Sequence, residues 1–343
     1  MNLLFDIGHP AHVHLLKNLI IYLKRKRHNV VVTTRNKDIT NRLLRYYDID
    51  FICISKPRNN IAGMILELIQ RNIIIFRLHK KYHFDASIGA TMSLAHLSAF
   101  YGVPSYNLGE DDDDVIPLYA MITFPFTTRI INPEVIRYKK WKKKRVLYQS
   151  YHELAYLHPN NFKPDESILD KYGLKKTRYV IIRLSALKAY HDIGKKGISN
   201  QLAKRIKQLC STYKIIESEE KNLVDQIEPW DMHHVLAFSK LLISDSQTMT
   251  IEAAVLGIPS IRINSFAGRC SVIEELEEKF NLTLGFKPND EETAMNAIKS
   301  ILINDKSSVE WEKKREVMLN EKFDFNQWMI NYFEDQGFLK IER

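Results

Sequence analysis

Near its amino end the chain carries a short apolar run, Asn2-Leu3-Leu4-Phe5-Asp6-Ile7-Gly8, that ends in glycine. Four apolar residues then recur at helical spacing, namely Val13, Leu16, Ile20 and Leu23. This segment closes with the cations of residues 24–27, which favour the negative end of a helix dipole. A β-branched run follows at residues 30–34, and such runs are typical of buried parallel strands. Together these patterns predict a right-handed βαβ unit with a parallel sheet.

The same alternation of strand and helix patterns extends along the chain and predicts two doubly wound α/β domains. A length of 343 residues is itself too great for one ordinary hydrophobic core. We expect a first domain at residues 1–137 and a basic, proline-punctuated connector at residues 138–165. A second domain is expected at residues 166–320, and a terminal helix at residues 321–343 is expected to pack back on the first domain.

Charge and cysteine content narrow the class of protein. The formal net charge of +9 favours acidic partners without naming them. Cys53, Cys210 and Cys270 have neither paired spacing nor a nearby histidine cluster, so neither a disulfide framework nor a zinc site is expected. No metal and no cofactor is predicted. Cysteines without paired spacing are consistent with the reducing cytoplasm, which is the expected location. The amino-terminal residues lack the pattern of a signal peptide.

The most hydrophobic stretch covers residues 61–78, but it contains Glu67, Gln70 and Arg71. Ionisable groups are costly in hydrocarbon, so the stretch is not expected to span a membrane. Lys80, Lys81 and the basic run at residues 139–145 accompany this amphipathic stretch. We therefore expect reversible docking on an anionic membrane surface, at the inner face of the membrane. The alternative is that these cations are simply solvated helix ends and linkers.

The sharpest functional signal is Ser244-Asp245-Ser246-Gln247-Thr248-Met249-Thr250-Ile251-Glu252-Ala253-Ala254, where a buried strand ends in small polar residues that open a helix. The free N–H groups and positive dipole end of such a helix suit a diphosphate, and the hydroxyls of Ser246 and Thr248 add donors. Glu252 lies about one turn further in, where a carboxylate can accept both hydroxyls of a ribose. The alternative is an ordinary capped helix with one exposed glutamate.

This segment, followed by Gly257-Ile258-Pro259, resembles the nucleotide-binding segment of GT-B proteins. Bacterial UDP-N-acetylglucosamine 2-epimerases and the N-acetylglucosaminyltransferase of peptidoglycan synthesis carry such a segment. The whole chain is more closely similar to domain-of-unknown-function family 354 (DUF354). The further stretches that carry this resemblance are Asp6-Ile7-Gly8-His9-Pro10-Ala11-His12, residues 151–159, Arg183-Leu184-Ser185-Ala186 and residues 191–197.

The resemblance implies a GT-B fold, in which two Rossmann-like doubly wound parallel-sheet domains face a cleft. It also implies that Ser246, Gln247, Thr248 and Glu252 bind the nucleotide of a nucleotide sugar. GT-B relatives usually have Gly-Gly at the phosphate turn, where this chain has Gln247 and Thr248. Side chains therefore occupy space that a backbone could have used, so the position of the pyrophosphate differs from that pattern.

By the same resemblance, the loop after the first strand of the second domain faces the cleft. Its charged and imidazole side chains are Arg183, Lys188, His191, Lys195 and Lys196. A cation there can neutralise a departing diphosphate; Arg183 is the best placed, and His191 is a further candidate for substrate contact. A basic surface loop is the alternative. His233 and His234 precede the signature helix, and because adjacent helical residues point in different directions, only His234 is taken as a candidate contact.

In the first domain, His9, His12 and His14 lie in and after the first βα turn, which borders the binding edge of a doubly wound sheet. Histidine is the natural base for an acceptor hydroxyl near neutral pH, and His9 is the first candidate. Glu110 opens the acidic run 110–114, and the resemblance to the 2-epimerases gives it a catalytic role on the sugar. The alternatives are capping or packing for the histidines, and a solvated or cation-recruiting loop for the acidic run.

The leading hypothesis is a nucleotide-sugar-dependent glycosyltransferase for cell-surface glycan or polysaccharide biosynthesis. UDP or a similar nucleotide would occupy the second domain and a glycan or lipid-linked acceptor the first, with the nucleotide sugar as substrate and no cofactor. The main rival is a 2-epimerase-like enzyme acting on the same donor. A third hypothesis is a non-catalytic nucleotide-sugar or membrane-binding protein on the same fold. Nucleic acid is not an expected partner, because the basic run lacks interleaved aromatic residues apart from Trp141.

Overall fold

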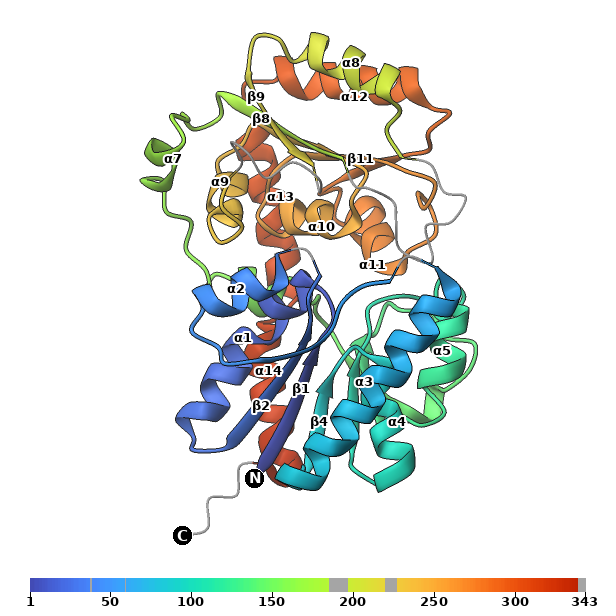
Figure 1. Ribbon diagram of the computed structural model, residues 1–343. Coiled ribbons are helices and arrows are strands. Elements are labelled where there is room, and N and C mark those ends of the chain that lie inside the picture. The colour runs from blue at the N-terminus through green and yellow to red at the C-terminus, as the bar shows by residue number, and fades with distance from the viewer. Residues whose placement is uncertain (38, 59, 185–196, 220–226, 339–343) are drawn as a thin grey trace. The chain divides into compact units, whose positions relative to one another are not determined.

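The computed structural model describes residues 1–37, 39–58, 60–184, 197–219 and 227–338 (Figure 1). The chain divides into two compact units. Met1–Tyr156 and Asp324–Arg343 form the first unit, and Leu157–Phe323 forms the second. Each unit is built on one parallel sheet, so the doubly wound α/β class predicted from the sequence is confirmed.

The sheet of the first unit has, within the described residues, seven parallel strands in the order β3-β2-β1-β4-β5-β6-β7. The strands are β1 (Asn2–Ile7), β2 (Asn29–Arg35), β3 (Ile52–Ser55), β4 (Ala86–Gly89), β5 (Ser105–Leu108), β6 (Arg129–Pro133) and β7 (Arg145–Tyr148). The two apolar runs with which the sequence opens are β1 and β2, paired from Asn2 with Asn29 to Ile7 with Thr34. Their predicted βαβ connection is therefore confirmed.

Helices cover both faces of this sheet. They are α1 (Pro10–Arg25), α2 (Thr40–Tyr46), α3 (Ile61–Tyr82), α4 (Met92–Tyr101), α5 (Pro117–Thr123), α6 (Leu154–Leu157) and α14 (Phe325–Phe333). Side chains of α3 and α4 pack with Leu4, Val31 and Ile54 of the sheet in one core cluster. Helix α1 connects strands in the opposite direction across the sheet, so right-handed crossovers place it, with α2 and α14, on the other face.

Helix α3 is one continuous helix of 22 residues, and it contains the hydrophobic stretch of residues 61–78. Asn60 caps its first turn by accepting a hydrogen bond from the N–H of Gly63 at 2.6 Å. His83, with a φ of 51°, ends it in the left-handed conformation. None of the helices in the described ranges is long and apolar enough to cross a bilayer.

Strand β7 lies where the sequence was expected to form a connector. Lys144, in the short 3-10 turn η1 (Lys142–Lys144), donates through Nζ to the carbonyls of Phe124, Pro125 and Thr127. The Arg145 guanidinium donates to Asn132 Oδ1 at 3.0 Å and to two backbone carbonyls. The charges that suggested a solvated linker are thus bound within the fold, and the strand they flank extends the sheet.

The terminal helix α14 belongs to the first unit. Its residues Phe325, Met329 and Phe333 are fully buried. Phe325 stacks on Tyr148 of β7 with 3.9 Å between ring centroids, and Phe333 meets Tyr106 of β5 edge-on at 5.3 Å. A π-helical turn, η4 (Glu334–Phe338), follows it. The last helix therefore completes the core that the first 156 residues begin.

The sheet of the second unit has five parallel strands among the described residues, in the order β12-β11-β10-β8-β9. They are β8 (Tyr179–Leu184), β9 (Lys214–Glu219), β10 (Leu241–Ser244), β11 (Ser260–Ile263) and β12 (Leu284–Phe286). The helical elements are α7 (Ile168–Lys171), α8 (Asn200–Leu209), α9 (Met232–Ala237), α10 (Gln247–Val255), α11 (Ser271–Glu274), η3 (Glu275–Lys279), α12 (Glu291–Ile303) and α13 (Ser307–Glu321). Figure 1 shows α8 and α12 on one side of the sheet and α9, α10 and α13 on the other.

Candidate functional site

The strand order of the second unit creates a switch point between β8 and β10. The chain leaves β8 for β9 on one side and returns to β10 on the other. Open α/β sheets bind ligands at such points, beyond the carboxyl ends of the strands. Arg183 of β8 pairs with Ser244 of β10, and the Asp245 N–H donates to the Arg183 carbonyl at 3.3 Å. The structure therefore brings the predicted Arg183 and the predicted 244–248 turn together at this point.

The first turn of α10 follows directly. Ser246 is its N-cap residue, but its side chain makes no capping hydrogen bond within the described part of the chain. Its N–H instead donates to Ser244 Oγ at 2.8 Å, and its carbonyl accepts from the Thr250 hydroxyl. Ser246, Gln247 and Thr248 are half-buried. A helix start with an uncommitted hydroxyl and a positive dipole end is suited to an anion.

Glu252 is buried rather than exposed. Its Oε1 lies 3.0 Å from Nε2 of His233, which comes from α9, and both side chains are only 7% exposed. A hydrogen bond to a charged group is among the stronger ones in proteins. The pair therefore fixes the orientation of the Glu252 carboxylate. An ionised carboxylate can take several donors, so this contact is compatible with ribose recognition.

His234 lies elsewhere. Its Nδ1 accepts the N–H of Asp165 at 3.0 Å, and its ring lies 4.8 Å from that of Phe162. The histidine beside Glu252 is thus His233, not the His234 chosen from the sequence. The spacing of three between His233 and the buried Leu236 is the signal that could have identified the inward-facing histidine. His191 lies outside the described residues.

The first unit has its own switch point, between β1 and β4. His9 follows β1 there and caps α1, its Nδ1 accepting the Ala11 N–H at 3.2 Å. An accepting Nδ1 carries no proton, so the proton of a neutral His9 lies on Nε2. His9 therefore presents a donor, where a general base was expected. His14 is buried and stacks on Tyr156, so packing accounts for it.

Beneath this switch point lies a buried ionic network. Asp6 is fully buried, and both of its carboxylate oxygens lie 2.6 Å from Nη2 of Arg71 on α3. Thr33 of β2 and Thr91, the N-cap residue of α4, donate their hydroxyls to the same carboxylate. The network joins β1, β2, α3 and α4, which holds the end of β1 and the turn at His9 in place.

Glu110, after β5, is paired with His152, after β7. One Glu110 oxygen accepts a hydrogen bond from the backbone N–H of His152 at 2.9 Å, and the other lies 3.2 Å from Nδ1 of the His152 ring. The ring also stacks on Tyr148 and Phe325. When Nδ1 donates to the carboxylate, the neutral ring keeps its lone pair on Nε2, as in catalytic triads. That nitrogen has no hydrogen-bond partner among the described residues.

His12 lies close to His9 and within electrostatic range of His152, the partner of Glu110. Its ring centroid lies 6.0 Å from that of His9. Burial lowers the pKa of His12 to about 4, and electrostatic repulsion from His152 adds to the shift. His9, His12, His152 and Glu110 thus occupy one edge of one sheet. His152 lies in the stretch 151–159 that carries the family resemblance, but it was not selected from the sequence because the strand that precedes it was not predicted.

Two other carboxylates of the acidic run, those of Asp112 and Asp113, bind backbone N–H groups. Asp112 is buried and accepts the Arg137 N–H at 2.6 Å. Asp113 accepts the N–H groups of Lys139 and Lys140. Across the described ranges no group of three or more metal-ligating side chains is placed to hold an ion.

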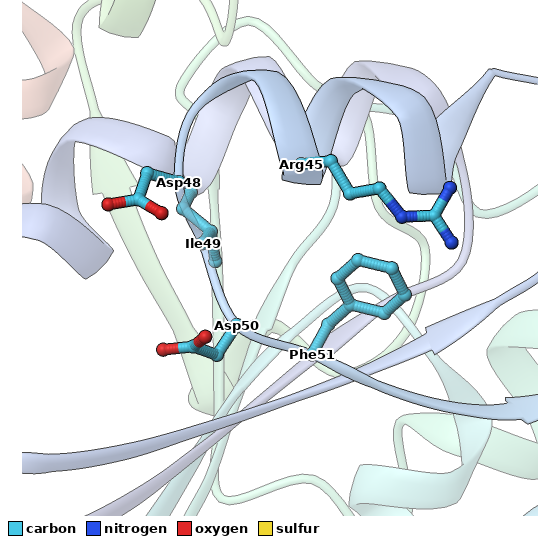
Figure 2. A pocket seen from close by; sticks show the side chains of 5 residues that line it. All are labelled: Arg45, Asp48, Ile49, Asp50 and Phe51. Atoms are coloured by element: carbon cyan, nitrogen blue, oxygen red, sulfur yellow. The ribbon is translucent and has the colours of Figure 1, made fainter.

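Figure 2 shows a surface hollow lined by Arg45, Asp48, Ile49, Asp50 and Phe51. Arg45 lies in the last turn of α2, and the other four residues join α2 to the first residue of β3. The hollow therefore lies at the amino edge of the sheet, opposite the edge that carries the candidate residues. It contains none of them.

Comparison with protein families gives one match that spans most of the chain. The sequence profile of the family described as "Protein of unknown function (DUF354)" matches residues 1–326. The chain belongs to this family. A comparison of the DUF354 chain with the curated proteins finds no match.

Solved structures give the fold of this DUF354 protein. The S. aureus MnaA structure with UDP is 14% identical with a TM-score of 0.70, covering 100% of this chain and 99% of that one. UDP-GlcNAc 2-epimerase from Neisseria meningitidis, bound to UDP-GlcNAc, is 11% identical with a TM-score of 0.57 and covers 92% and 99%. The spinosyn forosaminyltransferase SpnP is 12% identical with a TM-score of 0.66 and covers 98% and 99%. The fold is therefore of the GT-B type.

Proposed function

We propose that this DUF354 protein is a nucleotide-sugar-dependent, glycosyltransferase-like enzyme whose second unit binds a nucleoside diphosphate. The observation that carries the proposal is the β10–α10 turn at the switch point, with its uncommitted Ser246 hydroxyl and the buried Glu252 behind it. The solved structures with UDP and UDP-GlcNAc support UDP as the nucleotide. The N–H groups of the first turn of α10, with Ser246 and Thr248, hold the diphosphate in this proposal.

Glu252 accepts the ribose hydroxyls, and its hydrogen bond with His233 keeps the carboxylate oriented before the nucleotide arrives. Arg183, at the end of β8, neutralises charge on the departing diphosphate. Gln247 occupies the place of a glycine in GT-B relatives, and its amide is a further donor toward the phosphates.

In the first unit, the base that takes the acceptor proton is His152 Nε2, a buried nitrogen that the acceptor reaches once the side chains around it move aside. Glu110 supports this role because it binds Nδ1 and so fixes the tautomer in which Nε2 is basic. His9, whose Nδ1 is held by the Ala11 N–H, acts as a hydrogen-bond donor to the substrate. The acceptor is a glycan or lipid-linked molecule, and we place the protein in the cytoplasm at the inner face of a membrane.

A 2-epimerase-like activity is the second candidate. The same carboxylate–imidazole pair favours it, because an epimerase needs such groups to remove and return a carbon-bound proton. The structural likeness to the Neisseria meningitidis 2-epimerase adds to this candidate.

Nucleotide binding is tested first, by thermal unfolding with UDP and UDP-sugars. At a hundredfold excess over the dissociation constant, the ligand stabilises the protein by about 2.7 kcal/mol, a shift of several degrees. Glu252→Gln is expected to weaken UDP about thirtyfold, by roughly 2 kcal/mol. Glu312→Gln, at a half-exposed carboxylate of the same unit, is the control. No shift with any nucleotide at millimolar concentration would end the proposal.

Incubation of a nucleotide sugar alone in deuterated water separates the two activities. Deuterium that enters the sugar at C2 without an acceptor identifies the epimerase and excludes the transferase. Nucleotide binding with neither exchange nor transfer over a panel of acceptors identifies a binding protein.

A further inference from the structure

The outer face of α3 is a stripe of exposed aliphatic side chains. Ile61, Ile65, Ile69 and Ile73 recur every fourth residue, and Leu66 lies beside them. Each of the five is between 45% and 64% exposed. Residues four apart lie on one side of a helix, so the stripe extends about 18 Å along its axis. Contiguous apolar surface of this kind marks an interaction site rather than ordinary solvent-facing surface.

The charged residues of this segment point the other way. Glu67 is buried and receives two hydrogen bonds from Arg35, at 2.6 and 2.8 Å. Arg71 is buried against Asp6. The outer face from Ile61 to Ile73 therefore carries no charge, although the sequence counted Glu67 and Arg71 as its polar component.

The apolar surface continues over α4, which packs beside α3, and over α5, which packs beside α4 (Figure 1). Phe100 of α4 is 74% exposed, and its ring meets Phe76 of α3 at 5.5 Å. His96 of α4 joins the layer, with Asn72 of α3 at 2.9 Å and the Ile122 carbonyl of α5 at 3.3 Å. Met121 and Phe126, on and just after α5, are exposed large apolar residues as well. We call the exposed faces of α3, α4 and α5 the α3–α5 surface.

Cations border this surface, and its three helices expose no carboxylate. Arg58 and Arg77 line, with Leu66, Ile69 and Ile73, a shallow apolar groove along α3. Lys80 and Lys81 in its last turn are exposed. The only carboxylate in the sequences of α3, α4 and α5 is Glu67, which is buried and paired.

The basic run 139–145 contributes fewer exposed cations to this surface than its sequence suggests. Lys144 and Arg145 bind carbonyl and amide oxygens within the fold. Lys142 and Lys143 are exposed beside them, and through Lys144 they lie next to the segment that follows α5.

We propose that the α3–α5 surface docks on an anionic phospholipid bilayer. Aliphatic and aromatic side chains bordered by arginine and lysine complement hydrocarbon below and phosphate above. A second copy of this chain would set cations against cations, whereas anionic lipid neutralises them. This inference deepens the membrane location given in the proposed function, but docking does not require nucleotide binding, so failure of docking and failure of nucleotide binding are distinguishable.

The test is sedimentation of the full chain with phosphatidylcholine vesicles, with and without phosphatidylglycerol. Binding is expected with phosphatidylglycerol at low salt and is expected to weaken at high salt. The pair Ile65→Ser and Ile69→Ser is expected to weaken it about thirtyfold, because two half-exposed isoleucines no longer enter the bilayer. Ile303→Ser is the control, since Ile303 is 73% exposed at the end of α12 in the other unit.

The charge contribution is tested with Arg77→Gln and Lys80→Gln, which are expected to reduce the salt dependence. An unchanged thermal unfolding curve shows that each variant is folded. Absence of binding to phosphatidylglycerol vesicles would overturn the proposal, as would equal binding by the Ile65/Ile69 variant and the wild type. A concentration-dependent dimer that the same variant abolishes would also overturn it, because the surface would then bind a second copy.

Discussion

Replacement of Arg71 tests whether the buried network beneath the first switch point stabilises the fold. Arg71→Leu keeps the aliphatic bulk but removes two 2.6 Å contacts to the Asp6 carboxylate and a 2.9 Å hydrogen bond to Ser55 Oγ. Asp6 is fully buried, and the side-chain donors that it keeps among the described residues are the hydroxyls of Thr33 and Thr91. Breaking one partner of a buried ion pair costs about 3–5 kcal/mol, because the remaining charge is left uncompensated.

For a unit of this size, a loss of that magnitude lowers the melting temperature by roughly 6–20 °C. Urea unfolding at neutral pH, followed by circular dichroism, measures the free-energy difference directly. Arg77→Leu is the matched control, because Arg77 lies on the same helix and is exposed. If Arg71→Leu loses no more than about 0.5 kcal/mol relative to that control, the network does not stabilise the fold and the reasoning is refuted.

Three further predictions concern the histidines. The pKa of His12, lowered from 6.5 to about 4 by burial, means that the unfolded chain binds more protons between these values. The contribution of His12 to the free energy of unfolding should therefore be fully present above pH 6.5 and should be lost as the pH falls toward 4, by up to about 3 kcal/mol. In urea unfolding at several pH values, His12→Gln should flatten this dependence. His9→Ala should lower the free energy of unfolding by about 1 kcal/mol, because the helix cap is lost, whereas His9→Asn keeps the cap. Both variants should lower kcat about 10²-fold. An Asn variant with full activity would show that His9 acts only as a helix cap. His233→Phe should weaken UDP about tenfold in calorimetric titration by releasing Glu252, whereas His234→Phe should not; equal effects would contradict the assignment.

The spacing of the apolar residues and the composition of the segments were sufficient to predict the two doubly wound α/β domains. The β-branched run 30–34 and the helical spacing from Val13 to Leu23 appear as β2 and α1, with Val31 and Leu16 in the core. Strand β7 was missed because Lys144 and Arg145 resemble linker composition, and no local pattern reveals that their partners are carbonyls some 10 to 20 residues earlier. Strand β12, of three residues, is too short for a period to show.

The sequence predicted the position of the candidate site on the sheet edge better than it predicted which side chains contact one another there. Residues that follow strands, such as His9, Glu110 and Ser246, can be assigned to the binding edge from sequence, because parallel strands end at one edge. The choice between His233 and His234 depends on which side of a six-residue helix is buried, and that depends on tertiary packing. The cap made by His9 and the pairing of Glu110 with a residue 42 positions later are likewise set by packing.

The return of α14 to the first unit makes the second unit an insertion within the first. During synthesis on the ribosome, all of the second unit, Leu157–Phe323, emerges before the helix that covers Tyr106 and Tyr148. Domains generally fold as units in the order in which they are made, but here the second unit is made in full before the first is complete. The inserted unit can complete its core while the amino-terminal unit still exposes two tyrosine rings, and that unit closes only after its last helix, ending at Phe333, has left the exit tunnel.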